Sequence, residues 1–371
     1  MNQRERLLAV FSGEKPDITP WYADLIYWYE SHKTMQKLPK EYEGEEGYLK
    51  LHQDTGAGIY LYPPSVWKEE FGESIKTSVK KEGNKTLSTI CTPLGELSSI
   101  KEYLPQSFST AYKEYYIKKP EDLRIMRYIF SHRKITHCFD DFRRIDALWG
   151  GYGLPDLLAP ICVSPLQTLL SRWAGVQTTI FLLIDSKEEM ERTITELEKD
   201  DDEIFQIIAD SPAKLVEFPD NLSGEVTGEN LIEKYNLPYW QKRIEQLHKA
   251  GKFVGIHNDG TLKGSLSSII KAGFDFAEAV TPTPVGDLTL EEIKKIADDK
   301  IIIWGCLPGA LFSRVYSEDY FVNYLKKVIQ TFPLGSKFVL GVADQVPPDT
   351  DFLRICLVRE ILENQFKSDN K

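Results

Sequence analysis

The sequence predicts an α/β fold: an eight-stranded (β/α)8 TIM barrel with an N-terminal helical extension and an inserted antiparallel β meander. From residue 164 onward, short apolar segments alternate with helical periodicity, which is typical of a parallel sheet joined by crossover helices. The 371 residues, 42% of them hydrophobic, fit one barrel domain over 1–371 that carries an insert. No G-x-G-x-x-G segment follows a strand, so a doubly wound open sheet is the less favoured alternative.

The N-terminal part supplies the extension and the first strands. Residues 3–13 have the spacing of a short amphipathic helix, which a glycine and a proline end. A first strand is expected at 17–24, followed by an aromatic-rich segment at 25–29. A second strand is expected at 56–62, because two prolines follow it directly.

The middle of the chain changes pattern. Between about 74 and 103, apolar and polar residues alternate with period two around a Gly83-Asn84 turn, which predicts the inserted meander. Helices are expected from Pro120 and over 139–148. A strand between 152 and 163 would bring the total to eight.

The second half continues the alternation to the C-terminus. The helical patterns cover 165–173, 176–183, 187–208, 229–250, 263–272, 289–297, 318–331 and 350–365. The apolar strands between them are expected at 213–218, 253–256, 274–279, 300–304 and 337–341.

Polar residues follow several of these strands. His257 and Asp259 come straight after an apolar strand, and residues two apart in an extended chain point the same way. Such a pair often only caps a helix, but Asp220, Glu278 and Asp344 recur at the same place after other strands. Because the carboxyl ends of barrel strands meet at one mouth, we expect a site there. It suits a divalent metal or metal-free acid/base chemistry.

Composition excludes several classes of function. The net charge of −11 argues against nucleic-acid or anionic-membrane binding. The five cysteines show no C-x-x-C spacing, so a metal here would need mainly nitrogen and oxygen ligands. No run approaches 18 apolar residues and the chain starts in a charged helix, which leads us to expect a cytoplasmic protein.

Five segments in order carry a resemblance to a known family: Arg4–Asp17, Leu237–Trp240, Gly255–Gly260, Ile303–Pro308 and Gly341–Asp349. Together they resemble the uroporphyrinogen decarboxylase superfamily of barrels, and more closely its corrinoid-dependent methyltransferase branch. The resemblance implies methyl transfer between a small donor, expected to be a methoxylated aromatic or similar ether, and the cobalt of a corrinoid. It also implies a separate corrinoid-binding protein as partner, because the Asp-x-His-x-x-Gly cobalt-ligand motif is absent here.

The sequence departs from its relatives in informative ways. The region that carries arginine in the decarboxylases, here 19–29, is aromatic, so a polyanionic tetrapyrrole substrate would lack its expected counter-charges. The His-x-Cys and distant Cys zinc ligands of one methyltransferase group fall on His257, Asp259 and Asp344, so both thiolates have become carboxylates. In the demethylase pattern, two glutamates fall on Asn221 and Asn236.

The resemblance and the spacing together give a set of predicted roles. A divalent metal, with zinc as first expectation, would be held by His257, Asp259 and Asp344, and chemistry would involve His257, Asp259 and Glu278. Substrate contacts are predicted for Trp21, Tyr22, Asp24, Tyr27, Tyr60, Asn221, Asn236 and Gln345. Two alternatives stay open: a metal-free lyase and a non-catalytic small-molecule binding barrel. The inserted strands would also suit a homodimer.

Overall fold

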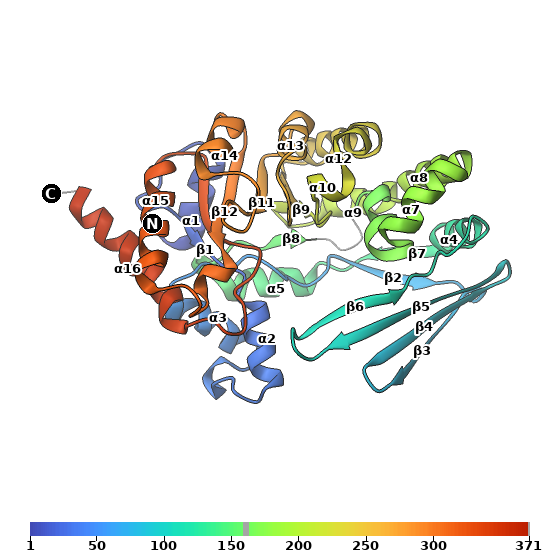
Figure 1. Ribbon diagram of the computed structural model, residues 1–371, viewed down its shortest axis with the longest axis horizontal. Coiled ribbons are helices and arrows are strands. Elements are labelled where there is room, and N and C mark those ends of the chain that lie inside the picture. The colour runs from blue at the N-terminus through green and yellow to red at the C-terminus, as the bar shows by residue number, and fades with distance from the viewer. Residues whose placement is uncertain (159–162, 370–371) are drawn as a thin grey trace. The chain divides into compact units, whose positions relative to one another are not determined.

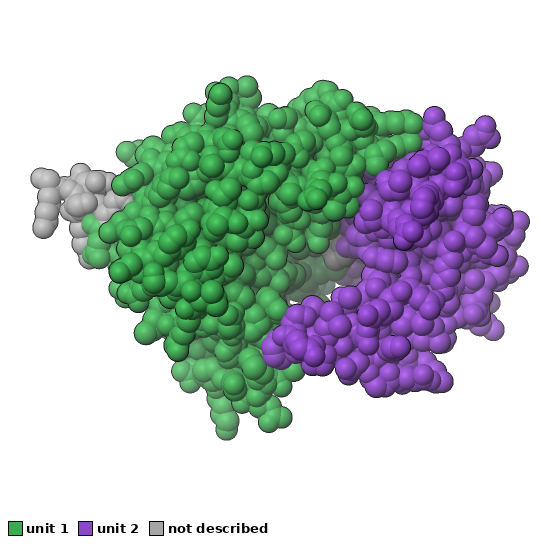
Figure 2. Space-filling view, viewed as in Figure 1, with its two compact units in different colours: residues 1–65, 140–160, 212–371 green, residues 66–139, 161–211 purple. Residues whose placement is uncertain are grey.

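The computed structural model describes residues 1–158 and 163–369, and the chain divides into two compact units. Residues 1–65, 140–160 and 212–371 form the first, here the barrel unit, and residues 66–139 and 161–211 form the second, here the insert unit (Figure 2). The predicted insert at 74–103 therefore lies within a larger unit built from two separate stretches of chain.

The barrel unit contains a seven-stranded, wholly parallel sheet (Figure 1). Its strands, in spatial order, are β1 (Trp21–Tyr22), β13 (Phe338–Ala343), β12 (Ile302–Pro308), β11 (Phe276–Val280), β10 (Phe253–His257), β9 (Leu215–Phe218) and β8 (Asp156–Leu158). Nearly every residue in them is buried, as expected for strands covered on both faces. Because the strands run the same way, their carboxyl ends share one edge of the sheet.

The predicted second strand, at 56–62, is replaced by isolated bridges. Gly58 pairs with Tyr22 of β1, and Ile59 pairs with Gly153 just before β8. A side chain at position 58 would collide with the Tyr22 ring, and Tyr62 takes a positive φ of 63° before two prolines, so regular pairing stops. The described sheet is therefore open with seven strands, where the sequence predicts a closed ring of eight. Residues 159–162, within the strand expected at 152–163, lie outside the described residues.

Helices of the barrel unit follow its strands in the predicted order. They are α1 (Gln3–Phe11), α2 (Ile26–Thr34), α3 (Gly44–Thr55), α5 (Asp140–Trp149), α10 (Gly224–Thr227), α11 (Glu229–Leu231), α12 (Leu237–Lys249), α13 (Leu266–Ala272), α14 (Leu290–Ala297), α15 (Glu318–Thr331) and α16 (Phe352–Asp369). Short 3-10 turns lie at Lys40–Tyr42, Gly150–Tyr152 and Gly309–Phe312, and a π-helical turn lies at Ile232–Asn236. No helix among the described residues has the length and apolar character that a membrane crossing requires.

An aromatic cluster closes the amino ends of the strands. Phe11, at the end of α1, lies 5.0 Å from Phe253 and 5.3 Å from Phe276, measured between ring centroids. Both partners are the first residues of their strands, β10 and β11, so α1 covers the amino end of the sheet. Trp304 and Tyr60 belong to the same buried cluster. With one end filled by aromatic side chains, the carboxyl ends remain for a site.

The insert unit combines two antiparallel sheets with helices. One sheet has the order β3 (Lys76–Glu82), β4 (Lys85–Thr92), β5 (Gly95–Leu104) and β6 (Ser109–Glu114); the other pairs β2 (Trp67–Phe71) with β7 (Arg133–His137). The sequence predicts the first three of these strands but not β6, whose residues are mostly exposed and polar. The helical elements are α4 (Asp122–Ser131), α6 (Pro165–Thr168), a π-helical turn (Leu169–Trp173), α7 (Gly175–Asp185), α8 (Lys187–Asp200) and α9 (Asp202–Asp210).

Candidate functional site

His257 and Glu278 are brought together by strand register. They are paired Cα neighbours, His257 as the last residue of β10 and Glu278 as the middle residue of β11. Nδ1 of His257 lies 2.6 Å from Oε2 of Glu278, and the Tyr60 hydroxyl donates to Oε1 of the same carboxylate at 2.6 Å. All three residues are buried. Glu278 therefore fixes one ring nitrogen of His257 and leaves the other, Nε2, directed elsewhere, as in metal sites where a carboxylate orients a histidine ligand.

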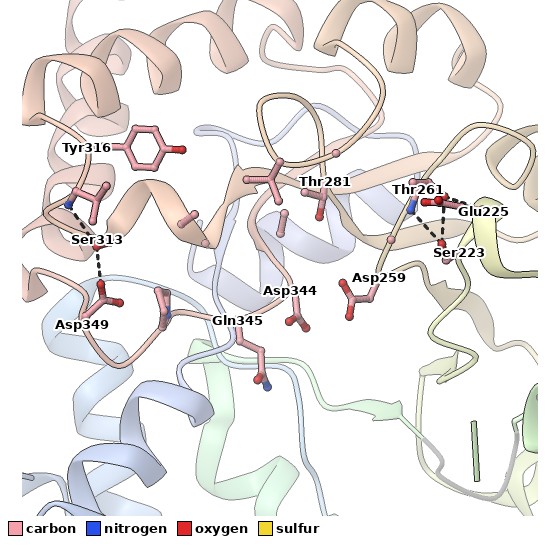
Figure 3. A pocket seen from close by; sticks show the side chains of 18 residues that line it. Ser223, Glu225, Asp259, Thr261, Thr281, Ser313, Tyr316, Asp344, Gln345 and Asp349 are labelled. Atoms are coloured by element: carbon pink, nitrogen blue, oxygen red, sulfur yellow. Dashed lines mark hydrogen bonds between the residues drawn. The ribbon is translucent and has the colours of Figure 1, made fainter. Parts of the chain in front are cut away.

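The Nε2 side of His257 faces two carboxylates. Nε2 lies 3.7 Å from Oδ1 of Asp344, and His257, Asp259 and Asp344 each offer a ligand atom within 4.8 Å of the others. Asp259 and Asp344 point into the same space (Figure 3). Asp344 follows β13 with a φ of 65°, a conformation that aspartate tolerates better than most residues. The three residues predicted as metal ligands thus converge.

A second set of carboxylates lies on the Nδ1 side, and the sequence analysis missed it. Oε1 of Glu217 lies 3.7 Å from Nδ1 of His257, and Glu217, His257 and Glu278 form another group whose ligand atoms lie within 4.8 Å of one another. Asp156, fully buried, interacts with Glu217. Apart from the contacts that Glu217 makes with Asp156 and Glu278, the carboxyl oxygens of Glu217 and Asp156 have no hydrogen-bond donor among the described residues. The sequence feature that could have revealed this group was Glu217, an acid inside the otherwise apolar strand 215–218.

Electrostatic coupling in this cluster is strong. Burial by itself would lower the pKa of His257, but the adjacent Glu278 carboxylate, with Asp344 and Asp259, raises that pKa to about 9. Burial, followed by repulsion from Glu278 and Asp156, raises the pKa of Glu217 well above its usual range. Burial also raises the pKa of Asp156 to about 7. Without a cation, the cluster therefore holds protons that a bound metal would displace.

Burial also raises the pKa of two further acids, Asp344 and Asp24. Burial, and then the charge of Asp259, raise the pKa of Asp344 to about 7. Burial raises the pKa of Asp24 to about 6, although three hydrogen bonds oppose the shift. Two of them come from Gln345 Nε2 at 2.7 Å and the Tyr62 hydroxyl at 3.1 Å. Asp24 and Gln345, both predicted substrate contacts, are thus joined to each other beside Asp344.

A pocket of about 710 Å³ opens over this end of the barrel unit. Its lining includes Asp259 and Asp344 together with Glu225, Asp349 and Tyr316 (Figure 3). It comes from the loops after β9, β10, β11, β12 and β13, the position at which barrel enzymes place their sites. The metal-capable group of His257, Asp259 and Asp344 therefore borders an open space large enough for a small molecule.

The other predicted substrate residues lie on β1, on α2, after β9 and in the π-helical turn. Trp21 is buried and stacks on Phe312, and the Tyr22 hydroxyl donates to the Gln3 carbonyl oxygen within the aromatic core. Tyr27 is half-buried on α2. Asn221 is exposed with a φ of 44°, and Asn236 is buried at the end of the π-helical turn. Asp220 instead accepts a hydrogen bond from Trp240 Nε1 at 2.9 Å.

Comparison with known proteins adds a likeness of fold. No protein-family model matches the sequence, and no curated protein matches it. Among solved structures, the chain is similar to a methyltransferase from Methanosarcina mazei, with a TM-score of 0.62 and 12% sequence identity. The similarity covers 99% of both chains. At this identity the likeness concerns the fold, and the chemistry has to be argued from the site.

Proposed function

We propose that this protein is a metal-assisted methyltransferase that moves a methyl group between a small donor and the cobalt of a corrinoid carried by a partner protein. The observation that carries the proposal is the orientation of His257: Glu278 holds Nδ1, and Nε2 faces Asp259 and Asp344 at the pocket. The likeness of fold to a methyltransferase and the ordered resemblance in sequence support it.

The residues present fit a divalent metal. One imidazole nitrogen and two carboxylates form a donor set of the kind that catalytic zinc sites use, with a position left for water or substrate. When bound, such a metal would act as a Lewis acid on the oxygen or nitrogen that loses the methyl group. Carboxylates in place of thiolates make it a harder centre, which disfavours a thiol as the group bound there.

In this proposal, the side chains of the protein position the metal and the reactants and do not form or break bonds themselves. Tyr60 and His257 donate to the two oxygens of Glu278, so this carboxylate locks the imidazole plane. The aromatic cluster around Phe11 and Trp304 closes the amino end and limits access to the carboxyl end. The partner's corrinoid would supply the nucleophile. Holding donor and acceptor in line at one pocket mouth is the contribution expected of the barrel.

A metal-free lyase is the second candidate, and one observation favours it. Glu217, whose pKa burial raises well above its usual range, lies 3.7 Å from the His257 ring and is able to hold a proton at neutral pH. A protonated carboxyl beside a histidine is the arrangement of a general acid/base pair.

Two measurements separate the candidates. Elemental analysis of the purified protein and of His257→Ala should show a divalent metal that the substitution removes. Incubation with cob(I)alamin and a panel of methylamines and methoxylated aromatics should form methylcobalamin, followed by its absorbance. A protein that holds no metal and leaves cob(I)alamin unmethylated with every donor would overturn the methyltransferase proposal.

A further inference from the structure

The charged side chains that line the pocket in the described chain are all acidic. Its lining contains four carboxylates, those of Glu225, Asp259, Asp344 and Asp349, and within the described chain no Lys, Arg or His lines it. Behind it lie further acids, Asp24 and Glu278, whose charges help to raise the pKa of Asp344. Clefts lined by one sign of charge focus the field and attract ligands of the opposite sign.

The pocket carboxylates also lack the partners that other acids of the barrel unit have. Asp17 pairs with Arg6 at 2.7 Å, and Asp54 pairs with Lys50 at 2.7 Å. In the described residues none of the four pocket acids has a Lys or Arg partner: Asp349 accepts from the Ser313 hydroxyl at 2.5 Å, and Asp344 faces only His257. A metal bound by His257, Asp259 and Asp344 would offset two of the four charges and leave two.

Apolar surface lies among these acids. Val285 and Val315 line the pocket and are 56% and 86% exposed, and Tyr316 lines it as well. Exposed apolar side chains beside unpaired carboxylates match a ligand that carries methyl groups around a positive charge, because the methyl groups need apolar contact and the charge needs anions or an aromatic face. A carboxylated or sulfonated ligand would find no counter-charge here.

We propose that the small molecule bound in this pocket is a methylated ammonium cation, of the size of choline or tetramethylammonium. The inference rests on the proposed function, since it names the methyl donor of that reaction as a cation rather than an aryl ether. The positive nitrogen is attracted by the summed field of the pocket carboxylates, to which Glu225 and Asp349 contribute from opposite sides (Figure 3), and its methyl groups contact the apolar part of the lining. A quaternary nitrogen has no lone pair for a metal to bind, so with this donor a metal held by His257, Asp259 and Asp344 would accept the lone pair of the neutral amine that forms as the methyl group leaves. The acidic pocket holds that neutral amine less strongly than the cation.

The test is binding without the corrinoid. Choline and 3,3-dimethyl-1-butanol have the same shape and differ in the charge of one atom, so isothermal titration of both at low salt isolates the electrostatic contribution. We expect choline to bind at least about tenfold more tightly, with an advantage that shrinks as salt is added. Glu225→Gln and Asp349→Asn should each lower choline affinity about threefold and leave the alcohol unchanged, the size expected for one partly exposed charge. Glu291→Gln, on α14 beside Lys327, is the matched control.

The possible outcomes distinguish the cation proposal from the methyltransferase proposal. Equal affinity for the two compounds, or choline affinity that is unchanged in both pocket variants, would overturn the cation proposal. Methylation of cob(I)alamin by an uncharged ether, with no choline binding, would overturn it while the methyltransferase proposal stands. Selective choline binding without methylation of cob(I)alamin by any methylated amine would support the ligand class and count against the methyltransferase.

Discussion

Replacing Glu278 by glutamine tests the orientation of His257 directly. Glutamine keeps the size of the side chain but removes the charge that faces Nδ1 at 2.6 Å. In protein treated with a chelator, the imidazole pKa should fall from about 9 to 6.5 or below, because burial then outweighs the remaining attraction of Asp344 and Asp259.

The size of the effect follows from the shift. Each pKa unit corresponds to about 1.4 kcal/mol, so a fall from about 9 to 6.5 represents about 3 kcal/mol of lost stabilisation of the imidazolium. That is also the range expected when one partner of a buried ion pair is removed. Part of the loss is regained at neutral pH, because His257 is then able to lose its proton.

The assay is an NMR titration of protein labelled at its six histidines. His257→Ala identifies the resonance, and Glu291→Gln, which changes a surface carboxylate on another helix, is the control. Tyr60→Phe, which removes the hydroxyl that donates to Glu278 Oε1, should change the titration less than Glu278→Gln does. A wild-type His257 that titrates near 6.5, or a midpoint that Glu278→Gln leaves in place, would refute the reasoning.

Three further predictions concern stability and metal binding. In chelator-treated protein, the raised pKa of Asp344, about 7, means that the unfolding free energy falls as pH rises from 3.8 to 7. The raised pKa of His257 contributes stability that is complete below pH 6.5 and is lost as pH rises through about 9. Urea unfolding should therefore show an unfolding free energy that falls from pH 5 to 9, with a smaller decline in Asp344→Asn. Glu217→Gln replaces a buried acid that lies against two other acids, Asp156 and Glu278, by a neutral amide that is able to donate to them. It should therefore raise the unfolding free energy of the same sample by about 1–3 kcal/mol. A lower unfolding free energy would argue that the carboxyl of Glu217 is already satisfied. Phe11→Ala should lower the unfolding free energy by about 3–5 kcal/mol, while the metal content, measured by elemental analysis, stays unchanged. A loss of metal would show that packing at the amino ends of the strands also shapes the site.

Local pattern predicted many of the elements. The helix expected at 318–331 is α15 (Glu318–Thr331), which starts where the Ser317 side chain accepts from the Tyr320 amide. The helix expected at 187–208 is instead divided at Asp201 into α8 and α9. Periodicity identifies which residues share a helical face, but it does not show where a chain turns between two helices with similar patterns.

Part of the candidate site was predictable from the sequence, and part was not. His257, Asp259 and Asp344 stand at or just after the ends of strands, so the rule that barrel strands end at one mouth was enough to group them. Glu278 lies inside β11, and strand register pairs it with His257. Glu217 and Asp156 lie within strands, and only the register of β8, β9 and β10 decides that they meet His257 inside the sheet. Trp21 and Tyr22 stand close to Asp24 in sequence, yet both are packed into the core, Trp21 against Phe312 and Tyr22 in the aromatic cluster.

By itself, the sequence determined the order of strands and helices, the acidic balance, and the presence of nitrogen and oxygen ligands after the strands, because these depend on neighbours along the chain. Tertiary structure alone decided which nitrogen of His257 is free, which acids lack a partner, and that the sheet shows seven strands with isolated bridges at Gly58 and Ile59. Those features depend on distances between residues far apart in sequence, which are fixed only when burial and strand register are satisfied together.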